Sequence, residues 1–286
     1  MKRHMAMALL PVALLAGCAN PFLGNVFEKA GWGQQPLPNL NSGQDIVNAL
    51  NRSDSFVDTL TDQQAQQAIE SLEDVIDGAV NTPVEQQAAL AVAEIAAASS
   101  GADDVVQSAN NLVTNLVADP SSLDVSNPLE IVSDLFDSDA PPASVREQVE
   151  GLLTTAGALN QYGTSLGGTD PMDPPSGTNS GDLASTALVS GFVSVLAQEH
   201  PDYPADPTTT PIPDSVFDDI VEVLQDPTTA DNPYVDGTAP LPMSTDPDAD
   251  VTDHLNALFA GSPGITNVVD SGLDLSSLAG LFGAGG

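Results

Sequence analysis

Apolar residues recur at intervals of three and four positions through most of the chain from Ser42 onward, which is the spacing of one face of an α-helix. In the segment TLTDQQAQQAIESLEDVIDGAV, this spacing places an apolar stripe on one side of a helix and the acidic residues on the other. The stripe consists of Ala65, Ala68, Ile69, Leu72, Val75, Ile76, Ala79 and Val80. No stretch shows the alternation typical of a half-buried β-strand. The sequence therefore predicts an all-α fold.

The start of one helix is marked with particular clarity. Thr82 is suited to the N-cap position, Pro83 to the first turn, and Glu85 to the acidic position of a capping box. The residues that follow, QQAALAVAEIAAASS, are apolar on nearly all sides, so this helix is predicted to be central. A second cap, proline and acid combination at 127–130 predicts another, short helix.

The domain organisation follows from these patterns and from the prolines. Residues 43–166 are predicted to form a helical domain, 167–181 a linker, and 182–286 a helical C-terminal part with long loops. Of the 23 prolines, 14 lie from Pro171 onward. Further helices are expected at about 105–117, 145–162, 182–199, 213–225 and 249–260. The predicted architecture is an irregular helical bundle or a short α-solenoid, as one domain or two abutting ones.

The first residues, MKRHMAMALLPVALLAGC, have the pattern of an export signal. Lys2 and Arg3 precede an apolar run that is well short of the roughly 20 residues needed to span a bilayer. Small residues then precede Cys18, as signal-peptide cleavage requires. Residues 1–17 are therefore predicted to be a signal peptide, and no later segment is expected to span a membrane.

The four residues Leu15-Ala16-Gly17-Cys18 resemble the lipobox of bacterial lipoproteins. The resemblance implies transfer of diacylglycerol to the sulfur of Cys18, cleavage before it, and acylation of the new amine, for example with palmitate. Residues 18–42 would then be a lipidated amino terminus and tether. Ala19 follows the cysteine, which by resemblance to lipoproteins of Gram-negative bacteria indicates the outer membrane. The alternative is a plain secretory signal with an incidental cysteine.

The charge balance restricts the partners of the chain. It has 40 acidic and five basic residues, and removing Lys2 and Arg3 with the signal leaves three basic ones. Repulsion excludes nucleic acid and disfavours contact with anionic head groups, so membrane contact is expected through the lipid on Cys18. Hydrophobic residues make up 41% of the chain, which is enough for a packed core.

Aspartate accounts for 30 of the 40 acidic residues, and lysine is nearly absent. This balance resembles proteins of salt-loving organisms, and an ordinary acidic exported protein is the alternative. Since three basic side chains cannot pair with 40 carboxylates, stability is expected to rise with salt concentration.

The segment 85–122 resembles a tetratricopeptide repeat. It combines a first helix rich in small residues, a glycine turn at Gly101, a second helix, and a closing Asp119-Pro120. The resemblance implies a helix-turn-helix architecture of the α-solenoid type. A helical bundle with short antiparallel connections is the alternative.

The residues that could be catalytic lie in predicted structural contexts that do not suit catalysis. Residues Gly163 to Gly167 satisfy G-x-S-x-G around Ser165, but a nucleophile elbow follows a strand, and here a helix is predicted. The two glycines are therefore interpreted as a helix C-cap. His200 is expected at a helix end, where a cation suits the dipole, and His254 beside an apolar stripe. No catalytic or cofactor-binding residue is assigned, and the chain is not predicted to be an enzyme.

One acidic loop has a calcium-like pattern. Alternate aspartates in STDPDADVTDHL resemble the start of a calcium loop, because Ca²⁺ binds six to eight oxygens. The candidate Ca²⁺ ligands are Asp246, Asp248, Asp250 and Asp253. Val251 and Ala257 occupy positions where an EF-hand loop has glycine and glutamate. The alternative is a loop in which Asp250 caps the following helix.

Together these patterns predict a lipid-anchored, exported helical protein that acts as a scaffold or protein-interaction module at the cell envelope. The alternative is an accessory ligand-binding lipoprotein, associated with a transporter, that holds a small molecule or a peptide between its helices. A pocket lined by aromatic and polar groups would favour the ligand-binding alternative, whereas a filled core would favour a protein partner.

Overall fold

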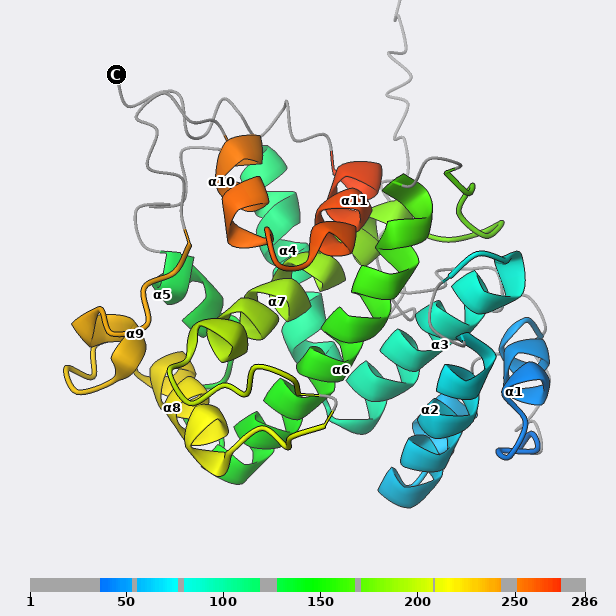
Figure 1. Cartoon of the computed structure of the whole chain (residues 1–286), viewed down its shortest axis with the longest axis horizontal. Helices are drawn as coiled ribbons and strands as arrows, with labels where there is room; N and C mark the ends of the chain where they lie inside the picture. Colours follow the sequence, from blue (N-terminus) through cyan, green and yellow to red (C-terminus); the bar gives the residue numbers. More distant parts are fainter. Residues whose placement is uncertain are drawn as a thin grey trace, which may run out of the picture.

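The computed structural model describes residues 37–52, 56–76, 80–118, 128–167, 171–207, 209–242 and 251–273. These residues form helices joined by turns and irregular loops, with no strand among them, which confirms the all-α prediction (Figure 1). In chain order the α-helices are α1 Gly43–Leu50, α2 Asp62–Ile76, α3 Pro83–Ser99, α4 Asp103–Ala118, α5 Pro128–Ser133, α6 Pro142–Gly167, α7 Ser180–Glu199, α8 Asp214–Gln225, α9 Pro233–Asp236, α10 Val251–Leu258 and α11 Pro263–Gly272. A 3₁₀ turn, Val57–Thr59, precedes α2.

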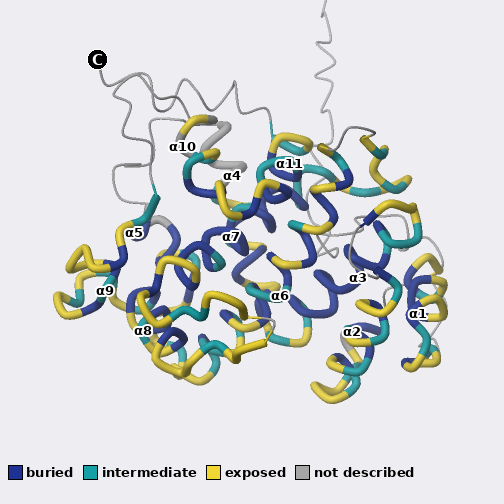
Figure 2. Tube along the Cα trace, in the orientation of Figure 1, coloured by how far each residue is buried: buried dark blue, intermediate teal, exposed yellow. Residues whose placement is uncertain are grey.

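Three long helices, α3, α6 and α7, form the centre of the molecule. α3 packs against α2 and α6, and α6 also packs against α7 and α11. α3 is buried along most of its length, as predicted from its apolar sequence, and α7 is buried to a similar extent (Figure 2). The buried residues of the N-terminal and C-terminal halves join in one hydrophobic core. Leu40 already belongs to this core, and its carbonyl accepts a hydrogen bond from Ser71.

The cap predicted for α3 is confirmed in detail. The Thr82 hydroxyl accepts a hydrogen bond from the Glu85 backbone N–H at 3.3 Å. The Glu85 carboxylate in turn accepts from the Asn81 N–H at 2.8 Å, and this bond lowers the pKa of Glu85. The Thr82 contact satisfies a backbone donor that a helix start leaves unpaired, and the Glu85 carboxylate binds the N–H of the residue before the N-cap.

Helix α11 crosses α6 at very short range, and glycine makes the approach possible. A Cβ atom on Gly163 would lie 1.8 Å from the carbonyl oxygen of Gly264, so no larger side chain fits there. The Gly264 N–H donates to the Asn160 side chain, and the Asn267 amide donates to the Gly163 carbonyl, each at 2.9 Å. Two glycines and two asparagines therefore fix the C-terminal helix onto the centre of the fold.

Helix α7 is long and apolar enough to be a candidate membrane span. No segment after the signal peptide was expected to meet these criteria. Its mean hydropathy is 1.3, but 72% of the apolar window is buried inside the protein. A helix buried in a protein core passes the same test, because apolar groups surround it on all sides, as they surround a membrane-spanning helix.

The segment that resembles a tetratricopeptide repeat contains most of α3 and the whole of α4. Their main neighbours lie outside this segment, since α3 packs on α2 and α6 while α4 packs on α7. The solenoid resemblance stays a prediction, and the irregular bundle describes the observed packing.

Candidate functional site around helix α8

Helix α8 makes side-chain polar contacts with α6, with the end of α7 and with the start of α9. One face buries the apolar side chains of Val216, Phe217, Ile220, Val221, Val223 and Leu224. The other positions include four carboxylates, from Asp214, Asp218, Asp219 and Glu222, and no basic residue. The helix is held on one side by His200 and on the other by Arg146.

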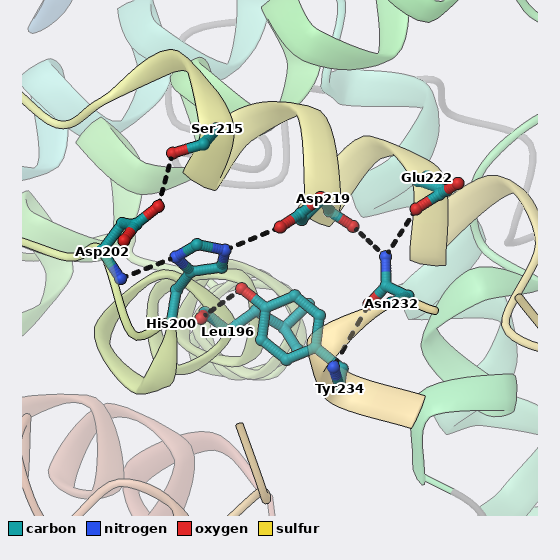
Figure 3. A network of polar contacts seen from close by, with 8 residues as sticks. All are labelled: Leu196, His200, Asp202, Ser215, Asp219, Glu222, Asn232 and Tyr234. Atoms are coloured by element: carbon teal, nitrogen blue, oxygen red, sulfur yellow. Dashed lines mark hydrogen bonds and ion pairs between the residues drawn. The ribbon is translucent and has the colours of Figure 1, made fainter. Parts of the chain in front are cut away.

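His200 ends α7 and is almost entirely buried, with 2% of its side chain exposed. Its Nε2 atom lies 2.8 Å from Oδ2 of Asp219, and its Nδ1 atom accepts the Asp202 backbone N–H at 3.1 Å (Figure 3). An Nδ1 atom that accepts this bond carries no proton, so the contacts assign the neutral ring with its proton on Nε2. The predicted position at a helix end is confirmed, but the bonds select a neutral imidazole and not a cation.

The contacts around His200 continue across three helices (Figure 3). Ser215 donates to the Asp202 carboxylate at 3.0 Å, and the Asn232 amide donates to the Asp219 carbonyl at 2.8 Å and to Glu222 at 3.1 Å. The Tyr234 hydroxyl donates to the Leu196 carbonyl at 2.7 Å. Burial, with a smaller contribution from the charge of Asp219, raises the pKa of Tyr234.

This network ties helices together and does not form a catalytic relay. A serine nucleophile requires its hydroxyl within hydrogen-bond reach of a base, and Ser215 is bonded to the carboxylate of Asp202. The imidazole nitrogen that could act as a base already accepts a backbone N–H. The network therefore positions α8 and α9 against the end of α7.

Arg146 holds the opposite side of α8. Its guanidinium contacts Glu150 at 3.0 Å, Asp214 at 2.5 Å and Asp218 at 3.5 Å, and lies 4.8 Å from the centre of the Phe217 ring. The hydrogen bond to Asp214, followed by the one to Glu150, raises the pKa of Arg146. One cation is thus shared by three carboxylates.

An open recess of about 440 Å³ lies beside Arg146, between the start of α6 and α8. It is lined by Pro142, Ala143, Arg146, Asp218, Val221, Glu222 and Gln225. Its lining contains no aromatic side chain, unlike most pockets that recognise a small molecule.

Most of the site residues predicted from the sequence do not take part in the contacts around α8. Cys18, Asp246, Asp248 and Asp250 lie outside the described residues. Asp253 is exposed in the first turn of α10; the side chain of His254, also in α10, lies outside the described part. Within the described ranges, no three His, Cys, Asp or Glu side chains are grouped to hold a metal ion.

The G-x-S-x-G motif has a structural role. Ser165 is buried, donates to the Tyr162 carbonyl at 2.6 Å and accepts from the Gln86 amide at 2.9 Å. It lies in α6, so the strand that a nucleophile elbow requires does not precede it. The C-cap interpretation is wrong for Gly163, which lies inside α6 and forms the crossing with α11, whereas Gly167 is the last residue of the helix.

Sequence reasoning missed the contacts around α8, although two signals were present. Arg146 precedes Glu150 by four residues, the spacing of a helical ion pair. Asn232 before Pro233 repeats the cap and proline pattern of α3, and its side chain does accept the Tyr234 N–H at 3.2 Å. The pairing of His200 with Asp219 has no local signal, because 19 residues separate them.

Comparison of the chain with protein-family models, curated proteins and solved structures finds no match in any of the three.

Proposed function

We propose that this chain is a lipid-anchored, exported protein that works as a protein-interaction module at the cell envelope. The observation that carries the proposal is Leu15-Ala16-Gly17-Cys18 at the end of a short apolar run, which resembles a complete lipobox. Two or more acyl chains on Cys18 would hold the protein at the membrane, because a single chain binds only marginally. Ala19 favours the outer membrane as its destination.

Two properties of the described helices support an interaction role. Buried apolar side chains of α3, α6, α7 and α11 belong to one hydrophobic core, and glycine occupies the close crossing of α6 with α11. Leu37 and Val235 are the large exposed hydrophobic residues of the described surface, so a partner would be recognised mainly through polar groups.

The second candidate is the accessory ligand-binding lipoprotein. The recess beside Arg146 favours it, because it is the kind of hollow that could hold a small polar ligand. Its open form and non-aromatic lining favour a protein partner more strongly, since small-molecule sites usually enclose most of the ligand.

The anchoring is tested by mass spectrometry of the membrane fraction after expression in a Gram-negative host. The wild-type chain should yield an amino-terminal peptide that begins at acylated Cys18. Cys18→Ala should leave the membrane fraction, whereas the matched variant Ala19→Ser, which keeps the lipobox, should remain there. Unchanged membrane association of Cys18→Ala would overturn the proposal.

The interaction role is tested separately by photo-crosslinking in the envelope. A photoreactive residue placed at exposed positions of α2 and α8 in turn should give a discrete adduct with another protein from one of them. Adducts from neither helix would argue against an interaction module and leave the ligand-binding alternative.

A further inference from the structure

We propose that the recess between the start of α6 and α8 receives a lysine or arginine side chain of the partner protein. This inference rests on the proposed interaction function and names the chemistry that the partner must present. The recess is lined by acceptor oxygens of α8, by apolar groups of α6 and α8, and by the guanidinium of Arg146. The acceptors and the apolar groups match the charged end and the methylene stem of a basic side chain.

The acceptor oxygens come from one face of α8. Asp218, Glu222 and Gln225 are four and three residues apart, so their side chains lie along the same side of the helix and all line the recess. Asp218 uses Oδ1 for Arg146, Glu222 uses Oε2 for Asn232, and Gln225 donates its amide to the Ala140 carbonyl. Within the described ranges, Oδ2 of Asp218, Oε1 of Glu222 and the single amide oxygen of Gln225 have no hydrogen-bond partner.

The apolar groups of the recess come from both helices. Pro142 and Ala143 form the first turn of α6, and Val221 lies between the acidic positions of α8. A lysine or arginine stem can pack on such a surface while its charged end reaches a carboxylate. A carboxylate ligand would lack a comparable match, because it would bring only further acceptors and a negative charge to the acceptors of α8.

The excess negative charge around the recess also favours a positively charged partner group. Three carboxylates, from Glu150, Asp214 and Asp218, contact the single guanidinium of Arg146, and Glu222 adds a fourth negative charge to the lining of the recess. A second cation therefore enters a region with excess negative charge, and the whole chain, at a net charge of −35, attracts it from a distance. Electrostatic complementarity thus selects a basic partner.

The test uses the full mature chain beginning at Cys18, in detergent, and a nonapeptide of alternating lysine and alanine with blocked ends. Binding is measured by calorimetry at low salt, with a glutamine-for-lysine peptide as the uncharged control. The double variant Asp218→Asn/Glu222→Gln should weaken binding about tenfold, since it removes two charge-assisted acceptors. The matched variant Glu70→Gln/Asp74→Asn removes the same charge from exposed positions of α2 and should weaken it no more than about twofold.

Circular dichroism melts of both variants show whether each is folded. In NMR spectra, the Val221 methyl signals of the wild type should shift on adding the lysine peptide and not the glutamine peptide. Equal weakening by the two double variants would reveal diffuse attraction to the acidic surface and overturn the proposal.

Two further outcomes are decisive. Failure of the lysine peptide to shift Val221 would also overturn the assignment of the recess, while membrane anchoring and photo-crosslinking would still test the proposed function independently. If spermidine binds with the same dependence on Asp218 and Glu222, and more tightly than the peptide, the site belongs to a small amine and not to a protein.

Discussion

The crossing of α6 and α11 makes a sharp prediction for two glycines of the same helix. Gly163→Ala should destabilise the protein strongly, whereas Gly157→Ala should stabilise it slightly. A Cβ on Gly157 meets nothing within 4 Å, and a Cβ on Gly163 would lie 1.8 Å from the Gly264 oxygen. Both changes add the same methyl group to α6, so any difference between them reports the crossing.

The magnitude follows from the overlap. Ordinary contact begins at 3.4 Å, so α6 and α11 must separate by about 1.6 Å to admit the methyl group of Gly163→Ala. Overpacking of this kind costs about 1–3 kcal/mol, and the separation also stretches the two asparagine hydrogen bonds, each contributing about 0.5–1.5 kcal/mol. We expect a loss of about 3 kcal/mol for Gly163→Ala and a gain of about 0.5–1 kcal/mol for Gly157→Ala from helix propensity.

Thermal unfolding followed by circular dichroism measures both effects. At about 2–4 °C per kcal/mol for a domain of this size, Gly163→Ala should lower Tm by about 6–12 °C and Gly157→Ala should raise it by about 1–4 °C. Urea unfolding should rank the variants in the same order. A Tm for Gly163→Ala at or above that of the wild type would refute the close crossing.

Four further predictions concern charge and polar contacts. Asp219→Ala should lower the free energy of unfolding by about 1–3 kcal/mol, because it leaves the Nε2–H of buried His200 without an acceptor; its neighbour Asp218→Ala should cost at most about 1 kcal/mol in the same urea titration. Melts in low and molar NaCl should show Tm rising with salt, and identical midpoints would show that the acidity is tolerated without counter-ions. Burial raises the pKa of Asp182, so the folded state holds this proton more tightly and stability should increase as pH falls through the raised pKa; Asp182→Asn should lose that increase in urea titrations between pH 7 and pH 4. If the aspartate loop binds calcium, millimolar Ca²⁺ should raise Tm and Asp248→Ala should abolish the rise, whereas an equal effect of Na⁺ at matched ionic strength would leave only the capping interpretation.

The helices were predictable because their signals are local. The expected helices at 182–199, 213–225 and 249–260 correspond to α7, α8 and α10, within about two residues at most ends. The cap at Thr82 was read correctly because its partner Glu85 lies three residues away. Helix α11 was overlooked even though Ser262 and Pro263 mark its start.

The arrangement of the helices was not predictable in the same way. The close approach at Gly163 depends on Gly264, and the polar contacts of α8 depend on Arg146 and His200, which lie on α6 and at the end of α7. A single sequence gives no information on which apolar stripes face one another. Because the sequence does not show that Gly264 approaches Gly163, Gly163 was interpreted as a helix terminus. Glycine suits both a C-cap and a close helix crossing.

The hydrogen bonds between α6 and α11 join residues 104 positions apart, which has a consequence for when the protein can fold. The central helix α6 ends at Gly167 and meets α11 only after the chain has been synthesised beyond Pro263, and such distant closures slow folding. Until residue 263 is available, α6 and α7 lack the helix that covers them in the finished protein. If the chain crosses the membrane unfolded during the export proposed above, this order of events would delay closure of the core until residues 263–272 have also crossed.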